Sequence, residues 1–172
     1  MQIENCEFKA RIHSITAYEA ILMKINPIYI GLDQQKDTYF NCNEGRLKLR
    51  EGNIENALIS YIRENTANSK QSIITLYNHK PDAALKIILE QQFGTKVVVN
   101  KLRKIYFVDN VKFHFDIVED LGTFLEVEAI NENGKFSYEE LKAQCDYFFD
   151  YFQLSSEDLI ENSYSDLILE LV

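Results

Sequence analysis

Basic side chains occupy every second position of the stretch RLKLRE, in which Arg46, Lys48 and Arg50 alternate with two leucines. In an extended strand this spacing places the three cations on one face, about 7 Å apart. Each neighbouring pair then repels by about 2.4 kcal/mol at an effective dielectric of 20. If this face is enclosed, the cations need an anionic partner, and planar guanidinium groups fit phosphate oxygens. The stretch therefore predicts a strand that binds a compact polyanion.

Paired carboxylates occupy the corresponding positions of a later alternating stretch, TFLEVEAI. Glu126 and Glu128 are two residues apart, so they share one face of a strand. Carboxylate oxygens at this spacing can hold a hard divalent cation such as Mg²⁺ or Mn²⁺. Such a cation neutralises phosphate oxygens and orients an in-line attack at phosphorus. Together the basic and acidic strands indicate phosphoryl or nucleotidyl chemistry on a triphosphate.

Polar and charged side chains occupy one face of three further alternating segments. These positions are Asn5, Glu7, Lys9 and Arg11; Lys101 and Arg103; and Lys112, His114 and Asp116. A half-buried antiparallel sheet also has one face in water, so an ordinary wet surface is the competing interpretation. A wet face usually mixes hydroxyls, amides and charges, whereas here nearly every position is ionisable, with cations and carboxylates on different strands. This segregation favours an enclosed site.

Seven alternating segments and four helical segments must position these side chains. Strands are expected at about 4–12, 37–50, 57–64, 73–78, 97–108, 111–118 and 123–130, separated by turn sequences such as NEG, EGN and VDN. Helices are expected at about 14–25, 82–93, 137–153 and 156–171. Ser137 and Glu140 form a capping box for the third helix, and Ser155 or Ser156 begins the fourth. The pattern indicates an α+β fold dominated by antiparallel strands.

The apolar faces of these strands need a cover, which the amphipathic helices can provide. If the sheet curls into a barrel with the helices outside, its charged face lines the interior and can hold a polar ligand. This arrangement would explain the three cations of RLKLRE. No linker rich in proline, glycine or serine divides the chain, so residues 1–172 are expected to form one domain.

The composition limits the partners. A formal net charge of -9 and a pI near 4.9 argue against general binding of DNA or RNA, which needs a basic face. No run approaches the roughly 18 apolar residues of a membrane helix, and the amino terminus MQIENCEFKA is too polar for a signal peptide. Cys6, Cys42 and Cys145 suit reduced thiols. We therefore expect a cytoplasmic protein with neither membrane nor nucleic acid as a partner; the oligomeric state is open.

Four stretches follow one another along almost the whole chain: NCEFKARI, QKDTYFNCNEGRLKLRE, NKLRKIYFVDNVKFHFDIVEDLGTFLEVEAI and NSYSDLI. In this order they resemble the CYTH superfamily, also called triphosphate tunnel metalloenzymes, and within it the class IV adenylate cyclase-like branch. The resemblance implies a closed antiparallel β-barrel, or tunnel, flanked by helices. Basic side chains inside it would bind a triphosphate, and acidic ones would hold Mg²⁺ or Mn²⁺. The common nucleotide motifs GxxxxGK[ST] and GxGxxG are absent.

The resemblance also implies roles for individual residues. The residues that would hold the metal are Glu7, Asp116, Glu126 and Glu128. The residues that would bind the phosphates are Lys9, Arg46, Lys48, Arg50, Arg63, Lys101 and Arg103. Of these two sets, Glu7, Lys9 and Glu128 would be the catalytic residues.

Three further residues would have accessory roles. Asn5 replaces the first glutamate of the family's ExExK motif, and a neutral amide is a weaker ligand for a hard cation. Tyr164 matches a carboxyl-terminal tyrosine that would close over the site. His114 could position a water or a ligand, or it could be a hydrogen-bonded structural histidine.

Three functions are open from the sequence. The leading one is an adenylate cyclase-like reaction that converts ATP to cyclic AMP and pyrophosphate. The second is the hydrolysis of an organic or inorganic triphosphate, as in a thiamine triphosphatase. The third is a binding module for nucleotides or polyphosphate without catalysis, which the substitution at Asn5 motivates. Which triphosphate is bound stays open, because the recognisable residues all address phosphate and metal.

Overall fold

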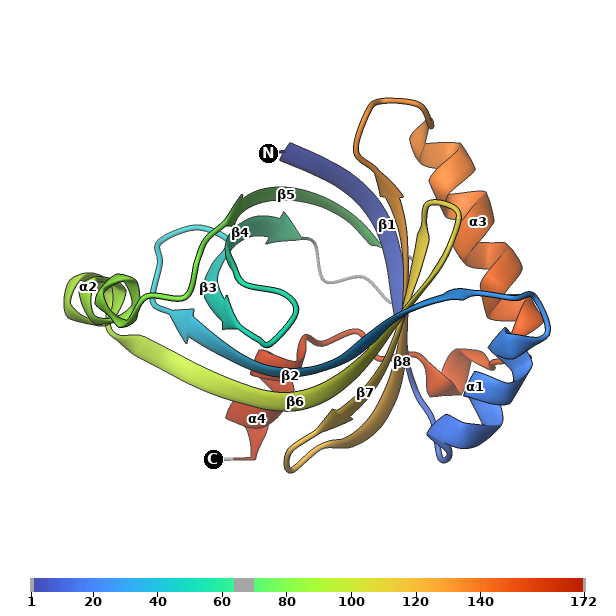
Figure 1. The fold of residues 1–172 in the computed structure, drawn as a ribbon, viewed down its shortest axis with the longest axis horizontal. Coiled ribbons are helices and arrows are strands. Elements are labelled where there is room, and N and C mark those ends of the chain that lie inside the picture. Colours follow the sequence, from blue (N-terminus) through green and yellow to red (C-terminus); the bar gives the residue numbers. More distant parts are fainter. Residues whose placement is uncertain (1, 64–69, 172) are drawn as a thin grey trace.

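A closed barrel of antiparallel strands forms the body of the protein. The structure, a computed structural model, describes residues 2–63 and 70–171. Within these residues eight strands close in the order β1-β5-β4-β3-β2-β6-β7-β8 (Figure 1). The strands are β1 (Gln2–Arg11), β2 (Ile28–Phe40), β3 (Arg46–Glu51), β4 (Ala57–Arg63), β5 (Lys70–Asn78), β6 (Thr95–Val108), β7 (Val111–Val118) and β8 (Gly122–Asn131). The predicted antiparallel barrel is confirmed.

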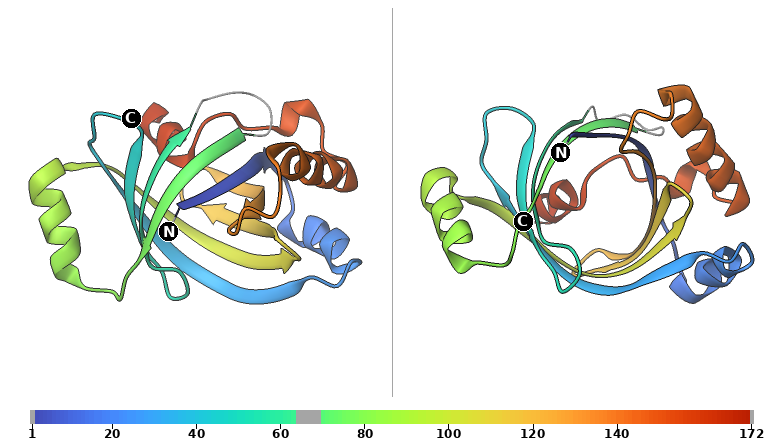
Figure 2. Two further views of the ribbon diagram at one scale, coloured as in Figure 1. Left: turned by 90° about the horizontal axis from the view of Figure 1, so that it is seen from above. Right: turned by 45° about the horizontal axis from the view of Figure 1, so that its top comes forward.

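Four helices flank this barrel (Figures 1 and 2). They are α1 (Ile15–Met23), α2 (Ala83–Phe93), α3 (Tyr138–Tyr151) and α4 (Tyr164–Glu170), with a short 3-10 turn, η1 (Ser156–Asp158), before α4. Helices α1 and α3 pack on the outer face of the barrel around β1, β7 and β8, whereas α2 lies at the opposite side beside β2. The predicted capping box of Ser137 and Glu140 is present at the start of α3.

The fourth helix differs from the prediction of one helix over 156–171. After η1 the chain is extended where it passes β1, and Ile160 N donates to the Lys9 carbonyl oxygen over 2.9 Å. The helix begins only after Ser163, whose side chain forms a capping box with Asp166. Because the helix starts here, its first residue, Tyr164, is buried at the barrel.

The strand predicted over 37–50 is two strands. Strand β2 begins at Ile28 and pairs with β6 along most of its length, and β3 returns beside it. The turn between them contains Gly45 at φ 63°, where an added Cβ would lie 2.6 Å from the Tyr61 carbonyl oxygen. Only glycine fits this tight return without strain. The prediction therefore missed the first part of β2, which has consequences for the site.

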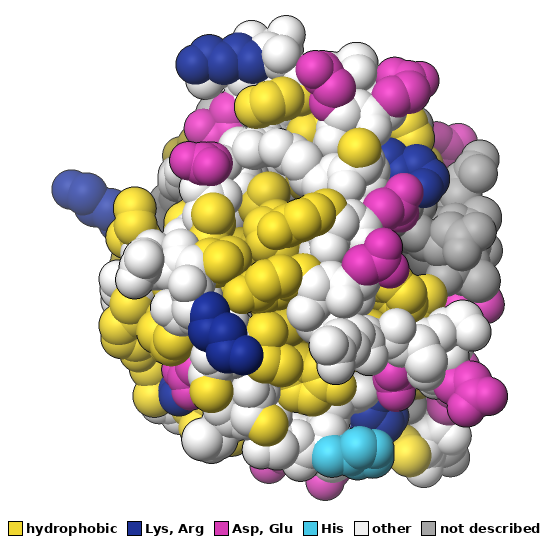
Figure 3. All heavy atoms as spheres, turned by 90° about the vertical axis from the view of Figure 1, so that its right-hand side faces the viewer, with side chains coloured by type: hydrophobic (Ala, Val, Ile, Leu, Met, Phe, Trp, Pro, Cys, Tyr) yellow, Lys and Arg dark blue, Asp and Glu magenta, His cyan; other side chains and the backbone are white. Residues whose placement is uncertain are grey.

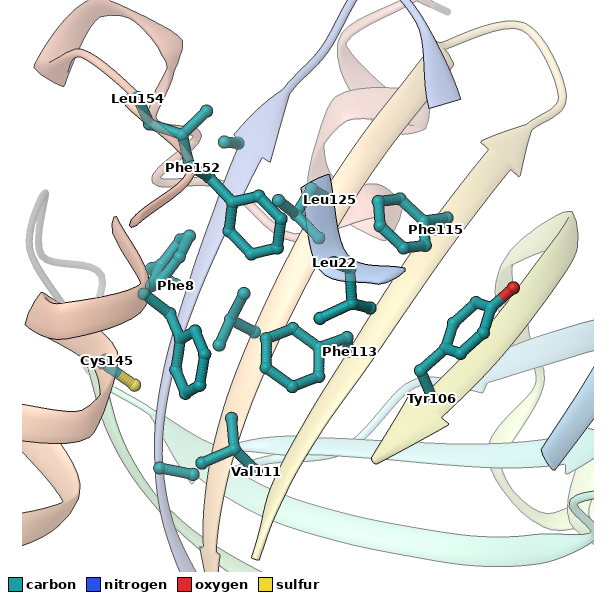
Figure 4. Close-up of a cluster of buried hydrophobic side chains, with 14 of the residues drawn as sticks. Phe8, Leu22, Tyr106, Val111, Phe113, Phe115, Leu125, Cys145, Phe152 and Leu154 are labelled. Atoms are coloured by element: carbon teal, nitrogen blue, oxygen red, sulfur yellow. The ribbon is translucent and has the colours of Figure 1, made fainter. Parts of the chain in front are cut away.

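The main hydrophobic core lies outside the barrel wall, between the strands and the helices (Figure 4). Phe113 of β7 points to this layer together with Leu22 of α1 and Phe152 at the end of α3. Its ring meets that of Phe148 edge-on, with the centroids 4.7 Å apart. Burial of each such side chain stabilises the fold by about 1.5–3 kcal/mol. Since alternate strand residues point to opposite faces, the polar alternates are left inside.

Hydrophobic side chains form a band on the face of the molecule that carries α1 and α3, with acidic side chains along its edge (Figure 3). Most of the aromatic side chains at the end of α3 pack inward, but Tyr147 is 59% exposed. Cys6 and Cys145 are buried in the core, whereas Cys42 is exposed. Among the described residues, no helix has the length and apolar character that crossing a membrane requires.

Candidate active site in the barrel interior

The barrel encloses a cavity of about 500 Å³. The right-hand view of Figure 2 shows the strands as a ring around this space. The predicted site residues that line the cavity are Glu7, Lys9, Lys48, Arg50, Lys101, Arg103, His114, Glu126, Glu128 and Tyr164. They come from six different segments of the chain, which only closure of the barrel can bring together.

A buried carboxylate, Asp37 of β2, holds the cations of two neighbouring strands. Arg50 forms a bidentate ion pair with it: Nε lies 2.9 Å from Asp37 Oδ1, and Nη2 lies 2.9 Å from Asp37 Oδ2. Lys48 Nζ and Lys101 Nζ lie 3.0 Å and 2.8 Å from Asp37 Oδ2. Three cations therefore contact Asp37, with Glu55 as a second partner of Arg50 alone, and the cluster retains excess positive charge on the cavity wall. Cations this close together inside the barrel repel one another, so they require anionic partners.

Burial and charge act in opposite directions on this cluster. Burial alone would raise the pKa of Asp37, but the charges of Arg50, Lys101 and Lys48 outweigh it and hold that pKa well below its usual value. Burial, with the nearby Arg50 and Arg103, also lowers the pKa of Lys101 well below its usual value despite the contact with Asp37. An additional anion in the cavity would therefore reduce the electrostatic repulsion among these cations.

We expect Asp37→Asn to lower the free energy of unfolding by about 3–5 kcal/mol at pH 7, because Lys48 and Lys101 lose their carboxylate partner and Arg50 keeps only Glu55. The folded pKa of Asp37 is depressed, so its contribution is complete above the unfolded value of about 3.9, declines below that value and is lost as the pH falls through the folded pKa. Urea unfolding at pH 7 and pH 3 measures the free energy of unfolding of wild type and variant. The gap between wild type and variant should narrow at pH 3, whereas Asp150→Asn on the exposed surface should change little at either pH.

A second buried pair joins β6 and β7. Arg103 donates from Nε and Nη2 to the two oxygens of Asp116, over 2.7 Å and 2.6 Å. Tyr164 of α4 donates its hydroxyl to Asp116 Oδ2 over 2.8 Å, and its ring lies 4.1 Å from Lys9 Nζ. Both oxygens of Asp116 are therefore engaged, and Asp116 does not line the cavity. In this structure Asp116 orients Arg103 and Tyr164.

Metal-ligand atoms gather where β7 and β8 pair. One ligand atom each of His114, Glu126 and Glu128 lies within 4.8 Å of the others. His114 is 1% exposed; its Nδ1 lies 3.6 Å from Glu126 Oε1, and neither ring nitrogen is within hydrogen-bond distance of another described residue. Burial and then the charge of Arg103 lower its pKa to about 3, so the ring is neutral at pH 7. This donor set fits a divalent cation that accepts carboxylate and imidazole ligands.

Glu128 has a buried support and a raised pKa. Asn5 of β1 donates its side-chain amide to Glu128 Oε1. Burial, followed by the charges of Glu7 and Glu126, raises the pKa of Glu128 to about 7, although Lys112 opposes this. A bound cation or a proton would satisfy this carboxylate. Asn5 is fully buried and does not line the cavity, so here it supports Glu128.

Two of the predicted phosphate-binding residues are not placed on the cavity wall. Arg46 lies at one end of β3 and donates to Asp166 Oδ2 of α4 over 2.6 Å. Arg63 ends β4, and its side chain lies outside the described residues. The roles of these two residues stay predictions.

Four residues that the sequence reasoning left out take part in the site. Asp37 was missed because β2 was predicted too short to show its alternation with Asp33 and Tyr39. Glu55, in the loop after β3, accepts from Arg50 Nη1 over 2.9 Å and also pairs with Lys112. Glu55 was missed because a loop has no periodic sequence pattern. Asp33 holds this loop in place by accepting hydrogen bonds from the backbone amides of residues 54 and 55. His79, at the end of β5, is partly buried and lines the cavity.

Comparison with known proteins agrees with this architecture. The family model of the CYTH domain matches residues 4–164. A protein of Pyrococcus horikoshii OT3 is 24% identical, with a TM-score of 0.80 over 95% of this chain and 98% of its own. A candidate adenylate cyclase from Vibrio parahaemolyticus is 18% identical, with a TM-score of 0.78 over 96% and 97%.

A third solved structure is that of a candidate adenylyl cyclase from Hippeastrum with a dominant triphosphatase activity. It is 13% identical, with a TM-score of 0.64 over 98% of this chain and 94% of its own. At these identities the three structures share the fold with this chain. No curated protein matches the sequence.

Proposed function

Because the chain belongs to the CYTH family, we propose that it is a metal-dependent enzyme that acts on a triphosphate. The reaction proposed is the conversion of ATP to cyclic AMP and pyrophosphate. One observation carries the proposal: basic side chains of β1, β3 and β6 converge with paired carboxylates of β8 on one cavity inside the barrel. A triphosphate is a compact polyanion of the kind that such a cavity would attract.

The cations of the cavity would hold the phosphates. Lys48, Arg50 and Lys101 share a single buried carboxylate, so their remaining donors can turn to phosphate oxygens. Lys9 and Arg103 approach from β1 and β6. A triphosphate bound between these groups would be fixed on several sides, which restricts the orientation of the reacting phosphorus.

Glu126 and Glu128 would hold the metal, with neutral His114 beside them and Glu7 across from Glu128 on β1. When bound, a divalent cation would neutralise phosphate charge during in-line displacement. Mg²⁺ and Mn²⁺ both accept carboxylate oxygens. Asp116, which the family resemblance places among the metal ligands, contacts Arg103 and Tyr164 in this structure, and its role as a ligand stays a prediction.

As an alternative to holding the metal, which would lower its pKa, Glu128 suits a proton acceptor. A carboxylate with a pKa of about 7 can take a proton from an attacking hydroxyl at neutral pH. In cyclisation the hydroxyl is the ribose 3′ group, which attacks the α phosphorus while pyrophosphate leaves. In hydrolysis it is a water that attacks the terminal phosphorus. The same residues can serve either reaction.

Triphosphate hydrolysis is the second candidate, and the Hippeastrum protein supports it, because that candidate cyclase has a dominant triphosphatase activity. The third candidate, binding without catalysis, was motivated by Asn5. The buried position of Asn5 weakens that motive, since the side chain supports Glu128 through a hydrogen bond.

The proposed function predicts specific products. Purified protein incubated with ATP and Mg²⁺ or Mn²⁺ should yield cyclic AMP and pyrophosphate, resolved by chromatography; thiamine triphosphate and inorganic triphosphate are tested in parallel. A triphosphate at 100 times its dissociation constant should also add about 2.7 kcal/mol to the stability. Orthophosphate without cyclic AMP would make the protein a triphosphatase. Stabilisation with no product under either metal would make it a binding module.

A further inference from the structure

A carboxylate of the loop between β3 and β4 joins cations of two strands inside the barrel. Glu55 Oε2 accepts from Arg50 Nη1 of β3 over 2.9 Å, and Glu55 Oε1 pairs with Lys112 Nζ of β7. Strands β2 and β6 separate β3 from β7 in the closed order, so this bridge crosses the barrel interior. All three side chains line the cavity. Glu55 therefore occupies donors that face the space proposed for the triphosphate.

The backbone of this loop is held against β2. Asp33 is fully buried and accepts hydrogen bonds from the backbone amides of Ile54 and Glu55, over 2.9 Å and 3.0 Å. Gly52 passes so close that an added Cβ would lie 2.6 Å from Asp33 Oδ1. Because the backbone at Glu55 is fixed in this way, its carboxylate can leave the two cations by rotation of the side chain.

The Glu55 side chain is 24% exposed, so such a rotation can bring the carboxylate to water. Burial would raise the pKa of Glu55, but the charges of Lys112 and Arg50 outweigh it and hold that pKa well below its usual value. The carboxylate is therefore ionised at neutral pH, and protonation does not release the two cations. Another anion is needed to replace Glu55 between them.

We propose that Glu55 is an internal competitor of the phosphates for Arg50 and Lys112. It occupies both cations in the empty cavity, yields them to the incoming triphosphate, and returns to them as the diphosphate product leaves. The inference rests on the proposed function. It holds for either candidate reaction, because cyclisation leaves pyrophosphate and hydrolysis leaves a diphosphate.

An internal competitor weakens the binding of each phosphate chain, since the chain must displace an ionised carboxylate that is tethered at the site. The cluster of Lys48, Arg50 and Lys101 around Asp37 has excess positive charge, which by itself would retain the product. Affinity differences among variants of one site appear mostly in the dissociation rate, so Glu55 should accelerate the release of the diphosphate.

The test measures the binding of inorganic triphosphate and of pyrophosphate by titration calorimetry at pH 8 in EDTA, where metal-dependent turnover does not interfere. Glu55→Gln keeps the size of the side chain and removes its charge, whereas Glu55→Asp keeps the charge. The matched control is Glu51→Gln. Glu51 lies at the end of β3, pairs with Lys86 of α2 over 3.2 Å and does not line the cavity.

Glu55→Gln should bind both anions about tenfold more tightly than wild type, which corresponds to about 1.4 kcal/mol. Glu55→Asp should stay closer to wild type, and Glu51→Gln should bind both anions as wild type does. If Glu55 instead orients Arg50 for the phosphates, Glu55→Gln would bind them more weakly, and that result would overturn the inference.

A crystal structure of wild type with inorganic triphosphate tests the inference without a variant. The Glu55 carboxylate should have left Arg50 Nη1 and Lys112 Nζ, and its persistence on both cations beside a bound triphosphate would contradict the proposal. If wild type binds neither inorganic triphosphate nor pyrophosphate, the proposed function itself fails. If wild type binds both and Glu55→Gln binds them no more tightly, the proposed function stands and Glu55 is not a competitor.

Discussion

Glu128→Gln is expected to reduce metal-dependent turnover by at least about 100-fold and to leave the fold intact. The amide keeps the shape of the side chain, but it is a weaker ligand for a hard cation and cannot accept a proton. Turnover of ATP and inorganic triphosphate with Mg²⁺ or Mn²⁺ measures the loss. Manganese binding by electron paramagnetic resonance reports separately on the metal site.

The fold should tolerate this change because the ionised Glu128 is itself unfavourable. Its folded pKa of about 7 is above the unfolded value of about 4.3, so its effect on stability becomes worse as the pH rises through that window. Gln carries no charge and should therefore unfold at a urea concentration equal to or above that of wild type at pH 8. Lowering the pH to 5 should reduce the difference between the urea concentrations at which Glu128→Gln and wild type unfold.

A matched control uses a carboxylate outside the barrel. Glu132 is exposed just beyond β8, and Glu132→Gln makes the same chemical change without touching the cavity. It should keep wild-type turnover and manganese binding. Full activity of Glu128→Gln with either metal would contradict the assignment of Glu128.

Arg50→Ala is expected to weaken inorganic triphosphate binding by about 100-fold. Its guanidinium holds Asp37 through two nitrogens and Glu55 through the third, and it presents its edge to the cavity. Without it, a charge-assisted pair of hydrogen bonds to phosphate is lost. Asp37 and Glu55 also each lose one cationic partner, so their negative charge repels the incoming anion more strongly. The free energy of unfolding should also fall, by about 3 kcal/mol.

Titration calorimetry and urea unfolding measure the two effects of Arg50→Ala. Arg50→Lys keeps the charge but loses the planar fork, so it should recover only part of the affinity. Lys142→Ala removes the same unit charge from an exposed pair with Asp146 and should leave binding unchanged. Wild-type affinity in Arg50→Ala would show that the cations of β3 do not bind the triphosphate.

Most elements of the fold could be predicted because strand and helix periodicities are local. The alternation at Phe113, His114 and their neighbours identified β7 and its two faces, and the Ser137 capping box located α3. The start of β2 was missed because Ile28, Tyr29 and Ile30 do not alternate, and these residues are exposed in the structure. The start of α4 was missed because two serine caps compete, and contact of the chain with β1 decides between them.

The sequence by itself determined which side chains share a strand face, since successive residues of a strand point to opposite sides. That was sufficient to predict an interior rich in lysine, arginine and glutamate. Only the tertiary structure decided which charges meet, because pairing depends on strands and loops far apart in the chain. Arg46 and Arg50 lie on the same face of β3, yet Arg46 pairs with Asp166 of α4 and Arg50 with Asp37 of β2. The local pattern is identical for both residues, and the closed barrel gives each a different partner.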